Sequence, residues 1–488
     1  MASRGFNTEK TATLSYNKMV TNFENMLKSV DNMIQSNNIY SVWIRLVIGK
    51  DKNSQIVFNS ASQDKDENLF MSLHYEKSGA GTGNKFVFKV AYDLFNYGQE
   101  TRKNVEKLDE LMYKAMNLSE KKAEDGMYCQ WQYGYNVYGN TQIVSPLYTG
   151  LLTSIEPSID YANGKTFYTL SGLSYITKTD NVYSYDQIGN NDTKTGSWNG
   201  LDLVLWILWY YHGNPDTVSS LPRDYSGNIG NQHPDVANGR SQKFNIDIPV
   251  ELMNTASNVY MDAMPGITPI DYCKEVLKKT YNTADKHYDT DSGEYKLESY
   301  EAAPHYTLYI TDGNDDIPTI HIGFEGSTVE SNAKTIDFNF NWFKKSNNIV
   351  IGWQPQVNMM VYLLSKNKRA ILKDELEELE DGNTPYEGDE LRKQIEKKKA
   401  ELNSLNAELS NSEYFKSTLT LVGIPSDIPL NIILNIKPQI FESVSRTQGQ
   451  YYLTAATDDI NTNGLFTTTL SLFRINNLKL YEEVFKWM

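Results

Sequence analysis

Cysteine is nearly absent from this chain. Among its 488 residues only Cys129 and Cys273 are cysteines, and they lie far apart in the sequence. A disulfide framework needs several cysteines, and a cysteine-based zinc site needs closely spaced pairs of them. The sequence therefore supports neither kind of site.

The chain also lacks an excess of basic residues and a long apolar run. Its 61 acidic residues outnumber its 46 Lys and Arg residues, which gives a formal net charge of −15. Binding to nucleic acid as a main task needs clustered Lys and Arg, so we expect no sequence-specific nucleic-acid binding. The most hydrophobic stretch, Leu201–Tyr211, is about half a membrane span, and the first ten residues lack the apolar core of a signal peptide. We therefore expect synthesis in the cytoplasm and no membrane insertion.

A phosphate-binding loop is lacking as well, although three glycines within residues 79–83 precede Lys85. Such a loop has Gly directly before its Lys and Ser or Thr directly after it, where this chain has Asn84 and Phe86. Both flanks alternate apolar and polar residues in the manner of strands. The glycines therefore predict a hairpin turn.

A second turn resembles half of a calcium-binding loop. Asp459, Asn461, Asn463 and Gly464 match the first half of an EF-hand, but its twelfth position, which needs a bidentate Glu, is Leu470. A turn in which Asn and Gly adopt left-handed backbone angles explains the same residues. We expect a turn here and no calcium site.

Catalytic and metal-binding motifs are not found. The chain has no Gly-x-Ser-x-Gly and no His-Glu-x-x-His sequence, and its histidines are scattered. Glu156 with Asp160, and Glu294 with Glu298, are acidic pairs of the kind that glycosidases use, but such pairs arise by chance in an acidic chain. We expect no catalytic, cofactor-binding or metal-binding residues. The six histidines are His74, His212, His233, His287, His305 and His321.

Alternation of apolar and polar residues predicts strands over much of the chain. The clearest is a hairpin within Gln450–Ile475, with a polar tip at Asp459–Gly464, preceded by strands within Ser417–Ile436. The other predicted strands cover residues 39–48, 69–75, 85–90, 126–137, 147–155, 165–170, 305–310, 319–324, 335–342 and 349–354.

Helical spacing predicts four helices outside these strands. The first begins at a capping box formed by Thr21 and Glu24 and runs to about residue 37, and the second covers about residues 101–117. The third is the apolar stretch 201–212. The fourth begins at Thr268, followed by Pro269 at the first helical position. Its predicted buried stripe is Ile270, Cys273 and Leu277.

Residues 366–411 form an insert rich in Glu and Lys that is broken by a polar stretch at residues 381–385. Leucines keep coiled-coil spacing on both sides of the break, with Lys398 at one seam position, which predicts an antiparallel helical hairpin. At 1.5 Å per residue its longer arm would reach roughly 35 Å. Two roles stay open: a solvated spacer, or an arm that touches a neighbouring protein. The seam residues are Leu372, Leu376, Leu379, Leu391, Ile395, Leu402, Leu405 and Leu409.

Short motifs mark the two strand-rich regions. The first holds Gly134-Tyr135, Gly150-Leu151-Leu152-Thr153 and Leu170-Ser171-Gly172, and the last reads STLTLVGIP, PLNIILNI and GQYYLTAATDDINTNGLFTTTLSLFRI. In this order the motifs resemble the opening and closing barrels of tail hub (baseplate hub) proteins of contractile-tailed bacteriophages, which are related to the hub part of type VI secretion spike proteins.

The resemblance implies an α+β, β-rich fold with two tube-like β-barrel domains around a mixed α+β middle region. The expected parts are an N-terminal segment with an amphipathic helix (1–37), a first barrel (38–178), the middle region (179–348) and a second barrel (349–488). The coiled-coil hairpin (366–411) is then an insert in the second barrel.

The resemblance also implies a structural virion protein of the tail baseplate and no enzyme. Three copies would form a ring that joins the tail tube to the central spike, adapts sixfold to threefold symmetry and takes part in DNA ejection. Partners would include the spike and tube proteins, with the tape measure and baseplate wedge proteins as further candidates. The alternative is a polysaccharide-binding or glycoside-cleaving tail protein.

The chain ends in an apolar helical face, which we expect either to contact a partner or to fold back on its own barrel. Its residues are Leu480, Val484, Phe485, Trp487 and Met488.

Overall fold

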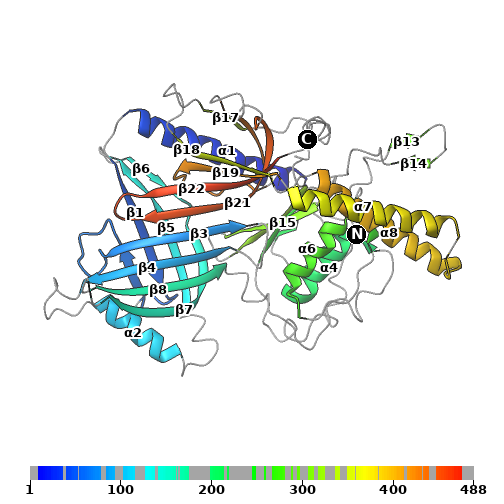
Figure 1. Cartoon of the computed structure of the whole chain (residues 1–488). Helices are drawn as coiled ribbons and strands as arrows, with labels where there is room; N and C mark the ends of the chain where they lie inside the picture. The colour runs from blue at the N-terminus through cyan, green and yellow to red at the C-terminus, as the bar shows by residue number, and fades with distance from the viewer. Residues whose placement is uncertain are drawn as a thin grey trace.

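The computed structural model describes residues 9–36, 40–52, 54–78, 84–93, 103–115, 127–137, 141–160, 162, 165–174, 198–213, 217–218, 244–248, 256, 258–259, 266–280, 287–289, 294–296, 306–312, 317–324, 336–340, 349–357, 359–382, 384–410, 415–430, 432–438 and 447–474. One large sheet, a smaller mixed region and a helical hairpin make up this part of the chain (Figure 1). No helix among these residues is long and apolar enough to cross a membrane.

Within the described residues the large sheet contains fourteen strands. Eleven follow the order β18-β19-β22-β21-β3-β4-β8-β7-β5-β1-β2, while β6 pairs with β5, and β20 lies between β17 and β21. They are β1 (Tyr40–Ile48), β2 (Ile56–Asn59), β3 (Phe70–Ser78), β4 (Lys85–Asp93), β5 (Tyr128–Val137), β6 (Thr141–Val144), β7 (Tyr148–Asp160), β8 (Lys165–Ser174), β17 (Ile336–Phe340), β18 (Val350–Val357), β19 (Phe415–Val422), β20 (Ile433–Pro438), β21 (Gly449–Asn461) and β22 (Phe466–Arg474).

Two sets of six strands follow the same order within this sheet. We call β3-β4-β8-β7-β5-β1 unit 1 and β18-β19-β22-β21-β20-β17 unit 2. The last strand differs, because β1 is antiparallel to β5 whereas β17 is parallel to β20. Two separate barrels are predicted from the sequence, but antiparallel pairing of β21 with β3 joins both units into one sheet.

The β7–β8 hairpin of unit 1 contains a bulge. Leu152 pairs with Gly172, and the next pair is Ser154 with Ser171, so Thr153 is the extra residue. The hydroxyl of Thr153 donates a hydrogen bond of 3.2 Å to the Ser171 carbonyl. A bulge of this kind bends the strand and increases its local twist.

The β21–β22 hairpin of unit 2 contains the same bulge. Leu453 pairs with Leu472 and Ala455 with Ser471, which leaves Thr454 as the extra residue. Its hydroxyl donates to the Ser471 carbonyl at 3.1 Å. The match of strand order, bulge and threonine bond makes unit 2 a structural repeat of unit 1.

The predicted strands and the hairpin are all found, with shifts at their ends. In this sheet the short strands β2 and β6 escape prediction. The hairpin tip is shorter than expected, because Asp459 is still paired with Thr467 and the turn is closed by bonds between Asn461 and Leu465. Gly464 in this turn has φ 104°, as a left-handed turn residue requires.

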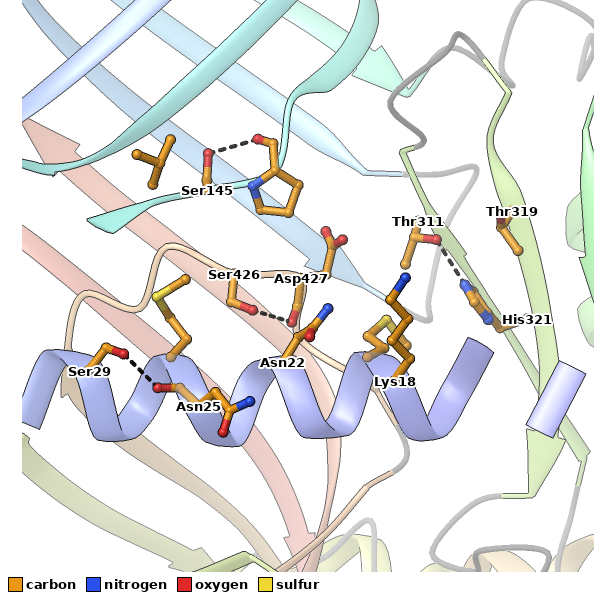
Figure 2. Close-up of a pocket in the computed structure, with 14 residues that line it drawn as sticks. Lys18, Asn22, Asn25, Ser29, Ser145, Thr311, Thr319, His321, Ser426 and Asp427 are labelled. Atoms are coloured by element: carbon orange, nitrogen blue, oxygen red, sulfur yellow. Dashed lines mark hydrogen bonds between the residues drawn. The ribbon is translucent and has the colours of Figure 1, made fainter. Parts of the chain in front are cut away.

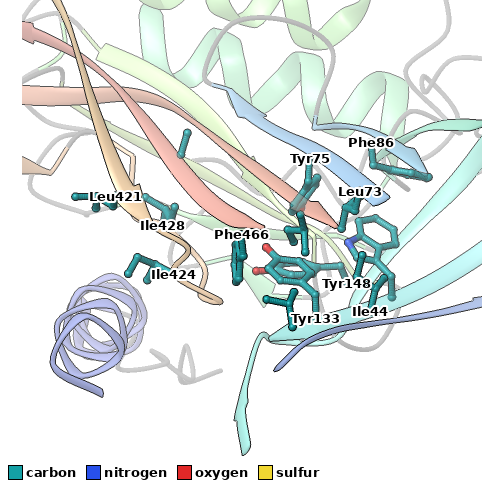
Figure 3. Packing of buried hydrophobic residues seen from close by; sticks show 14 of the residues in the cluster. Ile44, Leu73, Tyr75, Phe86, Tyr133, Tyr148, Leu421, Ile424, Ile428 and Phe466 are labelled. Carbon is teal, nitrogen blue, oxygen red and sulfur yellow. The ribbon is translucent and has the colours of Figure 1, made fainter. Parts of the chain in front are cut away.

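Aromatic side chains fill the core beneath the junction of the two units (Figure 3). Tyr133 stacks on Tyr148 with 5.8 Å between ring centroids, and Phe466 of unit 2 meets Tyr133 edge-on at 5.5 Å. The strands place them there by alternation: in β22 every second residue from Phe466 onward is buried. Each such ring buries a large apolar area, so the cluster contributes strongly to the stability of the core.

Helix α1 (Glu9–Gln35) begins earlier than the capping box predicts. Thr21 lies exposed in the middle of the helix, so the prediction of a helix start there is wrong. The residues before Thr21 continue the same helical turn, and a Thr-x-x-Glu spacing inside a helix caps nothing. The buried face of α1 joins the main core through Val20, Phe23, Leu27, Val30 and Met33.

The middle region has its own core of two helices on a small sheet (Figure 1). Helix α6 (Pro269–Lys279) begins as predicted, with the Thr268 hydroxyl accepting from the Asp271 amide, and its predicted stripe is buried. Helix α4 (Gly200–His212) is capped by the Asn199 side chain. The four-stranded sheet has the order β10 (Thr217–Val218), β11 (Asn245–Asp247), β16 (Thr319–Phe324) and β15 (Tyr306–Thr311). Two small antiparallel pairs are β9 (Trp198–Asn199) with β12 (Asn258–Val259), and β13 (His287–Asp289) with β14 (Glu294–Lys296).

Two further helices pack outside the sheets, α7 (Met359–Glu380) and α8 (Gly388–Ser410), in the insert between β18 and β19. Leu372 of α7 and Leu405 of α8 are buried together, and Lys398 bonds Glu375 across the pair at 2.5 Å. Helix α8 also contacts α6, so the hairpin packs against the middle region. Helix α2 (Lys103–Ala115) covers β2, where the Asn104 amide donates to the Val57 carbonyl at 2.7 Å.

Two glycines of the sequence motifs make room for one ring. A Cβ added to Gly150 would lie 2.6 Å from the Phe86 ring, and one added to Gly172 would lie 2.1 Å from it. We expect Gly172→Ala to lower the free energy of unfolding by about 1–3 kcal/mol, because the ring has to move in a packed core. Urea denaturation measures this change.

Gly323→Ala is the control, because a Cβ there meets no described atom within 4 Å. Its effect should stay within about 0.5 kcal/mol. Equal losses for the two variants would contradict the packing role of Gly172.

Candidate functional site: the junction of the two units

The two units meet where β3 pairs with β21, and this junction is the centre of the sheet. Seven residue pairs form it, from Ala455 opposite Ser78 to Asn461 opposite Ser72. Two ion pairs cross from β3 to β21, one exposed and one buried. His74 bonds Asp459 at 2.6 Å on the outer face, with both side chains about half exposed.

The buried pair joins Lys77 of unit 1 to Asp458 of unit 2 at 2.8 Å, with side chains 7% and 0% exposed. Asp458 also accepts bonds from the Tyr133 hydroxyl at 2.5 Å and the Thr468 hydroxyl at 2.6 Å. Lys77 donates a second bond to the Ser426 carbonyl at 2.9 Å. Both charges are therefore surrounded by hydrogen-bonding partners, which a buried ion pair needs to offset its desolvation.

A second buried carboxylate, Asp312, ties the middle region to unit 1. It accepts hydrogen bonds from the hydroxyls of Tyr75 (2.8 Å) and Ser174 and from the Asn84 amide (2.9 Å). Burial raises the pKa of Asp312 to about 6, although these bonds act in the opposite direction. This carboxyl group is therefore protonated in a pH range in which an exposed one is ionised.

A cavity of about 580 Å³ opens next to the junction, between α1, the segment after β6, the middle sheet and residues 426–427 (Figure 2). Its walls carry the amine of Lys18, the carboxylate of Asp427 and the ring of His321. His321 is held by Asp247 and Thr311, each at 2.8 Å from one ring nitrogen. Burial raises the pKa of Asp427. The cavity thus borders four parts of the chain, and its histidine is already engaged on both nitrogens.

The side chains at the junction have a structural role. The Lys77 amine is engaged by Asp458, so it is not a poised nucleophile or base. Among the residues that the structure describes, no three His, Cys, Asp or Glu side chains group as metal ligands. In the calcium-like turn, Asp459 instead binds His74.

The acidic pairs from the sequence are not brought together as a catalytic pair in the described part of the chain. Glu156 and Asp160 lie in the same strand, four residues and hence roughly 13 Å apart, which exceeds the separation that glycosidases use. Glu294 begins β14, and Glu298 lies outside the described residues. The predicted interface Leu480, Val484, Phe485, Trp487 and Met488 also lies outside them, as do His233 and His305.

Sequence reasoning missed the residues that matter most at this junction. Lys77 and Asp458 lie 381 positions apart, and neither stands in a recognisable motif. Lys77 does occupy an inward position of an alternating strand, which is the signal that could have revealed it. The charge of Asp458, in a strand that is otherwise apolar on that face, is the matching signal.

Comparison with known proteins gives structural neighbours only: no family model and no curated protein sequence matches the chain. The 43 kDa tail protein of prophage MuSo2 from Shewanella oneidensis is similar over 89% of this chain and 98% of its own, at 8% identity and a TM-score of 0.44. The tail protein from Neisseria meningitidis MC58 is similar over 89% of this chain and 96% of its own, at 8% identity and a TM-score of 0.39.

A third neighbour is an E. coli component of the type VI secretion system, described as structurally similar to T4 bacteriophage tail proteins. The similarity covers 84% of this chain and 74% of that protein's chain, at 8% identity and a TM-score of 0.39. The structural neighbours are thus phage tail and type VI secretion proteins, the two groups that the sequence motifs resemble.

The buried ion pair predicts a large effect of Lys77→Met. The substitution leaves Asp458 as an uncompensated buried charge, so the free energy of unfolding should fall by about 3–5 kcal/mol at pH 7. Urea denaturation checks this. The matched control is Asp459→Asn, which removes the exposed pair beside it and should cost less than about 1 kcal/mol. A small effect of both variants would contradict the structural role of the buried pair.

Asp312 predicts a pH dependence of stability. Its folded-state pKa of about 6 lies above the unfolded value, so the folded state binds the extra proton between about pH 4 and 6. Its contribution to stability therefore falls as the pH rises through this range, by about 3 kcal/mol in total. Asp312→Asn should remove that slope in urea titrations at stepped pH. An unchanged slope would assign the pH dependence to other groups.

Proposed function

We propose that this chain is the baseplate hub of a contractile phage tail, in which three copies form a ring between the tail tube and the central spike. The observation that carries the proposal is the structural repeat: one chain supplies two similar units that already pair edge to edge. Three such chains supply six similar units, the number that a sixfold tube presents, on a threefold body that suits a spike.

Complementary edges remain at the two ends of the repeat. Among the strands that the structure describes, β7 pairs only with β8 between Ser154 and Asp160, although the matching stretch of β21 pairs with β3 as well. In the same described part of the chain, β18 pairs only with β19, although its counterpart β3 also pairs with β21. The free edge of β7 in one copy thus matches the free edge of β18 in another. Heterologous edges of this kind build a closed ring when the rotation closes, and closure leaves no edge exposed.

Each unit would then be a tube-like barrel, with residues 38–178 and 349–488 as the two barrel domains around the middle region 179–348. The role is carried by shape and interfaces, so the protein acts without catalysis. The spike and tube proteins are the proposed direct partners, and the tape measure and baseplate wedge proteins are further candidates. The proposed location is the tail baseplate of the virion.

Two further surfaces suit partner contacts. The C-terminal segment 480–488, whose spacing in the sequence predicts an apolar face, is one. The α7–α8 hairpin is the other, because it projects from unit 2 and has exposed apolar side chains near the start of α7, among them Met360, Leu363 and Leu364. The acidic balance of the chain suits a ring around a channel through which DNA passes without binding.

A disulfide trap tests the ring. Transferring the β3–β21 register onto β18 and β7 places Glu156 of one copy opposite Gln356 of the next, at a non-hydrogen-bonded pair where Cα atoms lie close enough for a disulfide. We expect the Glu156→Cys, Gln356→Cys variant to give, on mild oxidation, a product of three chains that forms threefold rings in negative stain.

Each single-cysteine variant is the control and should give no three-chain product. A ladder that continues beyond three chains would indicate a filament and overturn the ring. A product that stops at two chains would overturn it as well.

A further inference from the structure

The two free edges each carry a proline at the position where the internal junction has its central pair. Within the chain, Asp458 of β21 lies opposite Tyr75 of β3. Counted from the shared bulge, Pro157 of β7 occupies the same position as Asp458 of β21. In the repeat, β3 and β4 of unit 1 correspond to β18 and β19 of unit 2. By the registers of these two strand pairs, Tyr75 of β3 occupies the same position as Pro355 of β18. Between two copies, Pro157 would therefore lie directly opposite Pro355.

At the internal junction the central pair exchanges main-chain hydrogen bonds. The Asn461 amide donates to Leu465 on the β22 side, and main-chain groups alternate sides along a strand, so those of Asp458 face β3. Tyr75 is the residue opposite. In an antiparallel ladder two residues that face each other in this way give and accept one bond each.

Pro157 directs its main chain outward, toward the free edge. The Ser174 amide donates to Asn84 on the β4 side, so Tyr168, six residues earlier in β8, also faces β4. Pro157 and Tyr168 therefore form a non-hydrogen-bonded pair. Because the main chain of Tyr168 faces β4, the main chain of Pro157 faces away from β8.

Pro355 directs its main chain outward as well. The Val422 amide donates to Ile349 on the β18 side, and Ser417, five residues earlier, therefore faces β22. Since Pro355 pairs with Ser417, its main chain faces away from β19 and toward the free edge. Proline has no N–H group, so each free edge lacks a donor at the centre of the expected junction.

The junction between copies would also lack the buried charges of the internal one. The counterpart of Asp458 is Pro157, and the register position of Lys77 corresponds to Val357. Main-chain carbonyls of the two prolines would face each other without a donor between them. Proline on an edge strand is a known means of preventing unwanted strand pairing.

We propose that Pro157 and Pro355 keep copies of this chain apart until a bound partner closes the ring. This inference rests on the proposed function and adds its regulation: the partner of each edge is a second copy of the chain, and the edges are too weak to pair unaided. Free chains then avoid both premature rings and open filaments. Without a covalent link, ring closure persists only where the tube or spike holds three chains in place.

The test compares the full-length protein with the Pro157→Thr, Pro355→Thr variant by mass photometry and light scattering over a range of concentrations. The variant restores both donors with a residue that suits strands. The native protein should remain a single chain at micromolar concentration. The variant should form three-chain particles at a concentration lower by at least about tenfold, as two added hydrogen bonds per junction imply.

Ser158→Thr, Gln354→Thr is the matched control. These neighbours lie on the same edges, but their main chains face β8 and β19, so the control should remain a single chain like the native protein. The two single-proline variants, each restoring one donor, should fall between native protein and double variant. If the melting temperature of the double variant is lower than that of the native protein, the single variants provide the test instead.

Two results would overturn the inference. If the native protein already forms three-chain rings at nanomolar concentration, the prolines do not hold copies apart, although the hub function stands. If the proline variants stay single chains while the disulfide trap yields three-chain rings, the prolines are not the limiting feature of the junction. Failure of the trap itself would instead count against the hub function.

Discussion

The pairing of β3 with β21 is the constraint on which the rest of the structure depends. It connects strands more than 370 residues apart and turns two units into one sheet. The buried Lys77–Asp458 pair fixes its register, because a shift of one strand by one residue would turn its charge to the opposite face and leave the other charge buried without its partner. The aromatic cluster below the junction packs only when this register is kept. Ion pair, ring packing and sheet order are therefore one cooperative arrangement.

Much of the fold could be predicted from the sequence, because strands that bury one face have to alternate. The hairpin of β21 and β22, the strands of unit 1 and the Thr268–Pro269 helix start follow from such local patterns. The start of α1 could not be predicted at Thr21, because a local spacing does not show what the preceding turns do. The strands β2 and β6 are too short to show a period.

The junction could not be predicted for a different reason. Its residues meet only through the fold. The inward strand position of Lys77 sets it apart in the sequence but does not indicate its partner, and Asp312 stands in no recognisable pattern. The repeat was also hidden at the level of residues. What the two units share is a strand order, a bulge position and one hydroxyl-to-carbonyl bond, which many different sequences can satisfy.

The location of the α7–α8 hairpin has a consequence for any body built from these units. The hairpin lies between β18 and β19 of unit 2, and the matching connection in unit 1, between β3 and β4, is only the short stretch 79–84. In a ring of three chains every second unit would carry an arm. A partner that binds the sheets would find six nearly equivalent positions, whereas a partner that binds the helical arms would find three. A single insertion thus lets one surface present two different periodicities.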